Sequence, residues 1–278
     1  MASNTSKSNY EPPKWFWDSR KKGPSSAGTF LFVALRAIDL PFQYWLLSSG
    51  AGSRLLKTIG LSSPTASAPL PTTGVLGQIS SATGLSPYHA LIIVLATGSA
   101  AKQIYWKLEI CDTVMPPGFS VGVAAYNTML NSLNTLFSLS SLSQDPSALL
   151  SQPLSLSSVP PTLAVGIPLY AVGLFWEWYS EIQRKAFKID PSNKGKPYSD
   201  GLFGLARNIN YGGYTLWRTG YSLISAGWAW GAVQGAFLAG DFTQRGIPSL
   251  DAYCEKRYGA QWDEVRRKVP YRLIPYIY

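Results

Sequence analysis

Residues 88–106 read YHALIIVLATGSAAKQIYW, and this stretch decides the fold class. Lys102 is its one formally charged residue, and Leu, Ile, Val and Ala fill most of the rest. A helix needs about 20 mostly apolar residues to cross the hydrocarbon core of a bilayer. The stretch therefore predicts a transmembrane helix.

Three other stretches before Glu181 have the same character: Phe30–Leu47, Val121–Leu142 and Leu163–Tyr179. Between positions 58 and 101 the chain has no Asp, Glu, Lys or Arg, and between 113 and 176 it has only Asp145. Charged residues are 14% of the chain, against roughly 25% in soluble globular domains. These features predict an all-α polytopic membrane helix bundle. The alternative is a Ser/Pro-rich disordered region beside a small core.

Polar residues inside the predicted spans are spaced to share helix faces. Arg36 and Asp39 are three residues apart, which favours an ion pair turned toward the bundle over a cavity-lining pair. Asn127, Asn131 and Asn134 also fall on one face. Hydrogen bonds between helices explain these amides as well as a substrate pocket does, so both interpretations stay open.

The distribution of Lys and Arg predicts the orientation in the membrane. Basic residues precede the first span and follow the second and fourth spans, whereas the other links carry few or none. We therefore expect a cytosolic polar segment over residues 1–29 and a four-span bundle over 30–180, with Ser/Pro-rich luminal loops at 61–86 and 140–161. Residues 181–278 then form a cytosol-facing C-terminal region, in which 211–240 adds a helical hairpin or one span plus an interfacial piece. Both termini are expected in the cytosol, without a cleavable signal peptide.

Histidine and cysteine are too few for several kinds of site. His89 is the one histidine, and Cys111 and Cys254 lie far apart without a CxxC pattern. A zinc site, a disulfide framework and a histidine-based catalytic triad are therefore not expected, and we expect no metal.

The C-terminal region is strongly basic, with 14 of the 24 Lys and Arg residues between Glu181 and Tyr278. A basic cytosolic tail attracts anionic lipid headgroups, and it can also hold a phosphate-bearing cofactor. Because the cluster adjoins membrane spans, nucleic acid is not an expected partner. Composition alone does not separate lipid binding from cofactor binding.

The order of residues in this region resembles the C-terminal region of the sterol reductase family. Residues 181–214 read EIQRKAFKIDPSNKGKPYSDGLFGLARNINYGGY, and 268–275 read KVPYRLIP. Three family elements are present. The first is matched by Gln183, Arg184, Phe187 and Lys188, the second by Gly201, Arg207, Asn210 and Tyr211, and the third by Asp251, Cys254, Arg257, Tyr258, Gly259 and Trp262. The sterol reductases share their fold with steroid 5-alpha reductases and, more distantly, with isoprenylcysteine carboxyl methyltransferases. Asn208 replaces the family's histidine and Tyr214 an acidic residue, which puts the geometry of the cofactor pocket and the activity in question.

This resemblance implies an NADPH-dependent reductase in the endoplasmic reticulum membrane that reduces a C=C bond of a sterol-like or other polycyclic lipid. The implied partners are a lipid-soluble substrate and membrane lipids, and the oligomeric state is left open. The residues that the resemblance assigns to NADPH are Gln183, Arg184, Lys188, Arg207, Asn210, Tyr211, Asp251, Arg257 and Tyr258. Reduction also needs a buried acid, for which Tyr126, Tyr170 and Glu177 are candidates. The alternatives are a methyltransferase that uses S-adenosylmethionine and a non-catalytic membrane protein that keeps the pocket.

Overall fold

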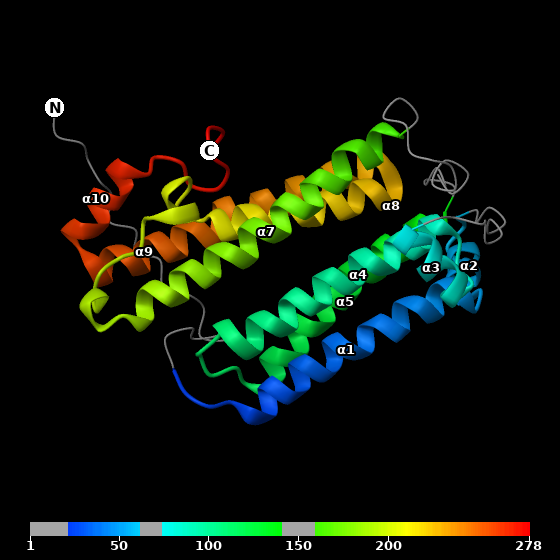
Figure 1. The fold of residues 1–278 in the computed structure, drawn as a ribbon, viewed down its shortest axis with the longest axis horizontal. Coiled ribbons are helices and arrows are strands. Elements are labelled where there is room, and N and C mark those ends of the chain that lie inside the picture. Colours follow the sequence, from blue (N-terminus) through cyan, green and yellow to red (C-terminus); the bar gives the residue numbers. More distant parts are fainter. Residues whose placement is uncertain (1–21, 62–73, 141–158) are drawn as a thin grey trace.

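The structure is a computed structural model that describes residues 22–61, 74–140 and 159–278 (Figure 1). All regular elements in these ranges are helices, so the predicted all-α class is confirmed for the described part of the chain. The long helices are α1 (Ser26–Ser48), α4 (Pro87–Tyr105), α5 (Pro117–Ser138), α7 (Pro161–Ile189) and α8 (Ile209–Asp241). The short α-helices are α2 (Ala51–Thr58), α3 (Gly74–Thr83), α9 (Ile247–Tyr258) and α10 (Ala260–Lys268). Two π-helical turns (Trp106–Ile110 and Phe242–Gly246) and two 3-10 turns (Pro191–Asn193 and Gly201–Gly204) complete them.

Each predicted apolar stretch forms a helix, and local signals set the helix starts. At α4, the hydroxyl of Ser86 accepts a hydrogen bond from the backbone N–H of His89, and Pro87 occupies the first turn. Prolines also begin α5 and α7, because a proline in the first turn loses no intrahelical hydrogen bond. Helix α7 continues beyond the predicted end at Tyr179 to Ile189.

The long helices lie in two groups (Figure 1). Helices α1, α4 and α5 pack together, and α7 packs along α8. Helices α9 and α10 and the C-terminus lie at one end of the molecule, and α2 and α3 lie at the other. The C-terminal helices therefore cover the ends of α7 and α8, where the sequence places its basic residues.

Glycines bring α7 and α8 into backbone contact. A Cβ added to Gly213 would lie 2.5 Å from the backbone nitrogen of Glu177, and one added to Gly220 would lie 2.5 Å from the carbonyl oxygen of Gly166. No real Cβ fits at such distances, so only glycine permits this separation. Small residues at helix contacts are typical of membrane bundles, in which packing drives helix association.

Helix α8 is a tight hairpin of two arms, which is the first of the two forms predicted for residues 211–240. Ala226 and Gly227 have non-helical backbone angles, and Gly227 has a φ of 77° that glycine adopts at no steric cost. Beyond this turn the chain runs back, since a Cβ on Gly235 would lie 2.8 Å from the hydroxyl oxygen of Thr219. The hairpin returns the chain to the end at which α8 begins.

The polar residues of the predicted spans meet in the interior. Arg36 and Asp39 are both fully buried and form an ion pair at 3.1 Å, which confirms the predicted pairing. The Asp39 carboxylate also accepts from Gln43 at 2.8 Å and from Asn131 at 2.7 Å. The side-chain oxygen of Asn131 accepts from Arg218 of α8 at 2.8 Å. Hydrogen bonds between helices thus account for these side chains, which join α1, α5 and α8.

Asn127 and Asn134 extend the same polar face of α5. Asn127 accepts from Arg218 and, at 2.6 Å, from Gln103 of α4. Asn134 accepts from Ser222 at 3.0 Å and from Trp230 at 2.7 Å, both on α8. Of the two interpretations left open for these amides, hydrogen bonding between helices is the one observed.

By length and apolar composition, fewer helices qualify as membrane spans than the sequence led us to expect. Helix α1 qualifies, and α3 with α4 makes a second if this pair, bent by 98°, is a single span. Several of the other long helices carry the buried polar residues described above, which lower their apolar character. The segments 1–21, 62–73 and 141–158 lie outside the described residues. The expected luminal loops are therefore described only at residues 61, 74–86, 140 and 159–161, and α3 forms within the first of them.

Candidate functional site

The candidate site lies where α7 ends and α8 begins. Glu181 of α7 is buried, with 4% of its surface exposed. One carboxylate oxygen accepts from the side-chain amide of Asn210 of α8 at 2.7 Å, and the other accepts from Arg184, one turn further along α7. Burial alone would lower the pKa of Arg184, but Glu181 and Tyr211 more than offset this, so its pKa is raised and the guanidinium stays charged.

Asn210 has unused hydrogen-bonding capacity in this cluster. Its amide nitrogen is bound to Glu181, but its side-chain oxygen is buried and has no partner among the described residues. A buried, unpaired acceptor costs free energy unless a ligand or an ordered water satisfies it. The cluster thus offers an acceptor, a carboxylate and a guanidinium at one place.

Aromatic side chains lie next to this cluster. Tyr211 stacks on Phe242, with ring centroids 4.6 Å apart and an angle of 10° between the rings, and Tyr214 meets Phe242 edge-on at 5.9 Å. Cys254 of α9 lies within electrostatic range of Tyr211 and Arg184. Burial, assisted by Asp251, raises the pKa of Cys254 to about 11. Its thiol is therefore protonated at neutral pH and is a poor nucleophile.

Gln183 holds the turn between α7 and α8. Its side-chain oxygen accepts from the backbone N–H of Leu202 at 2.9 Å. Gly201 adopts a φ of +56°, and a Cβ there would lie 2.6 Å from this oxygen of Gln183. A larger residue at 201 would therefore be strained and would collide with Gln183, which positions the turn.

Arg207 binds the C-terminal peptide. Its guanidinium donates to the carbonyl oxygens of Val269 at 2.6 Å and Pro270 at 3.3 Å. The backbone N–H groups of Arg207 and Asn208 donate to the carbonyls of Tyr271 and Arg272 at 2.9 and 3.0 Å. The tail is thus fastened to the chain that leads into α8. Burial, opposed by the charge of Asp251, lowers the pKa of Arg207.

The remaining predicted cofactor residues lie on α9 or at the end of α7. Asp251 accepts from Trp262 of α10 at 3.2 Å. Arg257 is exposed, donates to Tyr253 at 2.8 Å and lies over the ring of Tyr258, 5.5 Å from its centroid. Lys188 is exposed near the end of α7. Lys188 lies within electrostatic range of Glu181 and Arg184. No hydrogen bond or ion pair among the described residues joins Asp251, Arg257 or Tyr258 to Glu181.

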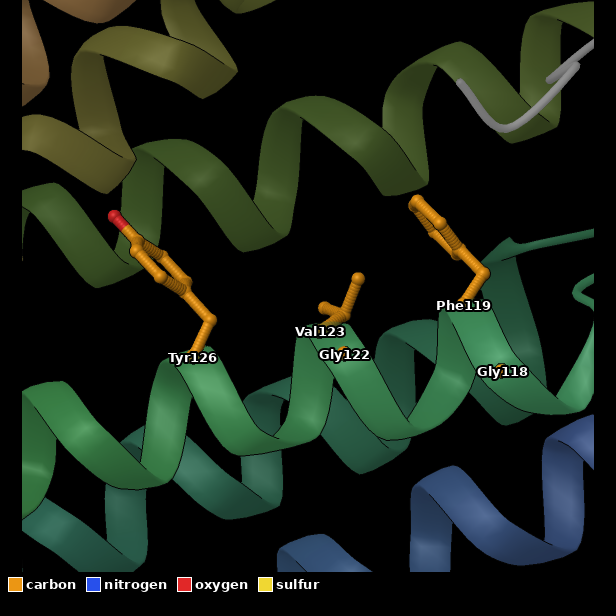
Figure 2. A pocket seen from close by; sticks show the side chains of 5 residues that line it. All are labelled: Gly118, Phe119, Gly122, Val123 and Tyr126. Atoms are coloured by element: carbon orange, nitrogen blue, oxygen red, sulfur yellow. The ribbon is translucent and has the colours of Figure 1, made fainter. Parts of the chain in front are cut away.

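The three candidate acids have different environments. Tyr170 donates to the carbonyl oxygen of Leu95 at 2.7 Å inside the bundle. Glu177 binds Lys102 and accepts from the indole N–H of Trp217 at 2.6 Å, so its carboxylate is already paired. Tyr126 lines a pocket on α5 (Figure 2).

The structure therefore brings Arg184, Asn210 and Tyr211 together, whereas Gln183 binds the turn that precedes α8. Glu181, which links Arg184 to Asn210, is not among the residues predicted from the sequence. A signal for it was present, since Glu181 lies three residues before Arg184 and so faces the same side of the helix.

Comparisons with known proteins agree with a membrane-associated family. Residues 142–269 match the family described as "Protein of unknown function (DUF1295)", a membrane-associated family related to steroid reductases and methyltransferases. The chain is also 36% identical over 236 residues to "Probable O-methyltransferase ustE" from Ustilaginoidea virens, a match that covers 85% of this chain and 81% of that protein. The specific resemblance to sterol reductases is not directly confirmed. The chain therefore belongs to the same protein family as the probable O-methyltransferase ustE, and its residues 142–269 match the DUF1295 family.

Proposed function

We propose that this protein is a membrane-embedded O-methyltransferase that uses S-adenosylmethionine. The observation that carries the proposal is the 36% identity, over 85% of the chain, to a protein named as a probable O-methyltransferase. This relative covers the bundle as well as the C-terminal region, whereas the resemblance to sterol reductases is confined to about the last third of the chain. The sequence motifs alone favoured the reductase, but the coverage of this relative makes the methyltransferase the preferred function.

The charges at the ends of α7 and α8 fit this cofactor. When bound, S-adenosylmethionine supplies a methyl group on a positively charged sulfonium sulfur. Its amino group and ribose hydroxyls are donors, for which Glu181 and the unpaired side-chain oxygen of Asn210 are acceptors. Arg184 would pair with its carboxylate. The stacked rings of Tyr211 and Phe242 offer a surface for a cation or for adenine.

The second candidate remains an NADPH-dependent reductase of a C=C bond in a sterol-like lipid. The matched elements from Gln183 to Trp262 and the basic C-terminal region favour it. NADPH carries several phosphate charges, so it would need cations that are available to bind phosphate. Glu181 offsets the charge of Arg184, so this pair can bind one carboxylate but has no net positive charge for several phosphates, and Arg207 donates to tail carbonyls. These contacts make the net charge of the cluster a better match to S-adenosylmethionine.

We further propose that the chain crosses the membrane of the endoplasmic reticulum several times, with both termini in the cytosol. The basic residues at the α9 and α10 end support this orientation, because cytosolic flanks carry an excess of Lys and Arg. The α8 hairpin adds two arms to the four spans expected from the sequence. The cofactor site would then face the cytosol.

A binding assay on detergent-purified protein tests the proposal. We expect isothermal titration calorimetry to detect binding of S-adenosylmethionine and little binding of NADPH. Asn210→Ala and Arg184→Ala each remove a contact to a charged group, so each should weaken binding about ten- to a hundredfold. Lys256→Ala, which removes an exposed cation of α9, is the control and should leave the affinity unchanged. If the protein binds NADPH tightly and does not bind S-adenosylmethionine, it is a reductase and the proposal is wrong. Binding of neither compound would favour a non-catalytic protein.

A further inference from the structure

Helix α5 carries a pocket outside the candidate cofactor site. It has a volume of about 400 Å³ and is lined by Gly118, Phe119, Gly122, Val123 and Tyr126. The three side chains project from the same side of the helix (Figure 2). A Cβ added to Gly118 or Gly122 would meet nothing within 4 Å in the described part of the chain. Volumes of 300–1,000 Å³ with mostly apolar walls and few polar groups are typical of small-molecule sites.

One end of this groove leads toward the candidate cofactor site. Tyr126 lies within electrostatic range of Tyr214, Arg218, Asp241 and Arg245, all from α8 and the turn that follows it. Tyr214 contacts Phe242 edge-on, and Phe242 stacks on Tyr211. Tyr211 in turn lies within electrostatic range of Glu181 and Arg184. Tyr214 and Phe242 are thus close to Tyr126 on one side, and through their ring contacts to Tyr211 they are close to the cluster on the other.

The polar interior behind Tyr126 carries excess positive charge. Arg218 is fully buried, and its guanidinium is bound by the neutral amide oxygens of Asn127 and Asn131. The nearby carboxylate of Asp39 is already paired with Arg36. The Nε and Nη2 groups of Arg36 are buried without a partner among the described residues. Two guanidinium groups thus share one carboxylate, which favours a ligand with a negative charge or an acidic oxygen.

We propose that the groove lined by Gly118, Phe119, Gly122, Val123 and Tyr126 binds the substrate, and that this substrate is an apolar molecule with a phenol or carboxylic acid group. The apolar part lies against the glycines and Phe119, and the acidic oxygen points toward Tyr126 and the positive charge behind it. This inference rests on the proposed O-methyltransferase function, for which a phenol or carboxylate oxygen is the methyl acceptor.

The same face carries a GxxxG spacing, at Gly118 and Gly122, which is also found where membrane helices pair. A pairing face of this type needs the two backbones to approach closely. Here the rings of Phe119 and Tyr126 lie on either side of Gly122 and leave a hollow instead of a flat face. A second copy of the chain is therefore the competing occupant, and the experiment below separates the two.

Fluorescent probes test the groove without any need for methyl transfer. Pyrenebutyric acid is apolar and acidic, and pyrenebutanol is its neutral counterpart. Binding of each to the purified protein is measured by energy transfer from the 10 tryptophans to pyrene. We expect the acid to bind more tightly than the alcohol, and Tyr126→Phe to reduce this preference.

Gly122→Phe fills the groove and should weaken binding of pyrenebutyric acid at least about tenfold. Val121→Phe adds the same ring to the neighbouring exposed position outside the groove and should change binding less than about twofold. Thermal unfolding and S-adenosylmethionine binding of both variants report whether the fold is intact, and Gly118→Leu is a second groove variant. Equal effects of the two phenylalanines, or equal binding of acid and alcohol, would overturn the proposal.

Light scattering of the same samples gives the oligomeric state. If Gly122→Phe converts a dimer to a monomer and leaves probe binding unchanged, the face is a contact between copies and the substrate proposal is wrong. If the probe binds as expected but S-adenosylmethionine does not, the groove stands and the proposed transferase function fails. The two proposals can therefore fail separately.

Discussion

Gly213→Ala should weaken both the α7–α8 contact and the candidate cofactor site. A Cβ at this position would lie 2.5 Å from the backbone nitrogen of Glu177 and 2.6 Å from the carbonyl oxygen of Gly173. Both atoms belong to the backbone, so no side-chain rotation relieves the overlap. Ordinary contact begins near 3.4 Å, and reaching it from 2.5 Å requires a shift of about 0.9 Å.

This shift is large enough to affect the site, because Glu181 and Asn210 lie about one turn from the point of contact. Their hydrogen bond is 2.7 Å long, and a separation greater by about 0.9 Å exceeds the 3.5 Å limit of such a bond. Overpacking typically costs about 1–3 kcal/mol, and loss of a hydrogen bond to a charged group costs about 1.5–3 kcal/mol. We therefore expect a lower Tm and an affinity for S-adenosylmethionine reduced about ten- to a hundredfold.

The assay compares Gly213→Ala with Gly240→Ala in the same detergent, by thermal unfolding and calorimetric titration. A Cβ at Gly240 meets nothing within 4 Å in the described residues, so this second variant is the matched control. It should be neutral or slightly stabilising, because alanine favours a helix more than glycine does by about 1 kcal/mol. If the two variants unfold at the same temperature and bind the cofactor equally, the reasoning from close helix contact is refuted.

Three further predictions follow from other parts of the structure. The folded state holds the proton of Cys254 up to a pKa of about 11 instead of 9.0, so the free energy of unfolding should fall by roughly 3 kcal/mol at most as pH rises through this window. Cys254→Ala should lack this fall in denaturant titrations, and parallel pH profiles of the two proteins would contradict it. Arg207→Ala should release the tail over residues 269–278 and speed its amide hydrogen exchange about tenfold or more. Replacing the exposed Arg267 by alanine should leave this exchange unchanged. If the exchange rates of the tail are unchanged in both variants, the Arg207 guanidinium does not hold it. A glycosylation acceptor inserted at residues 190–200, on the proposed cytosolic side, should remain unmodified. One inserted at residues 62–73, on the proposed luminal side, should be modified. The reverse pattern would show that the proposed topology is inverted.

Much of the helical organisation could be predicted from the sequence. The long helices form at the long apolar stretches with few charges. Apolar side chains leave water at little cost in free energy, and a helix supplies the hydrogen bonds of their backbone N–H and C=O groups. The three-residue spacing of Arg36 and Asp39 was sufficient to predict their ion pair, since residues three apart face the same side of a helix. The hairpin in α8 was one of two predicted forms, and its turn coincides with Gly227.

The site could be predicted only in part. Arg184, Asn210 and Tyr211 were named from their place in matched motifs, and the structure places them together. Arg207 was named from the same motifs, but the structure shows it bound to the tail. A motif shows which residue types occur together along the chain. It does not show which backbone carbonyl a guanidinium binds after folding.

The sequence by itself determined the helical class, the basic C-terminal region and the close approach that glycines permit. These properties depend on residue type and local spacing, which act over a few turns of chain. Only the tertiary structure decided that Glu181 joins Arg184 to Asn210 and that Tyr126 opens onto a groove. Asn210 is 29 positions from Glu181, and Arg218 is 91 positions from Asn127. Contacts over such separations arise when helices pack, and no local pattern in the chain encodes which face of one helix meets which face of another.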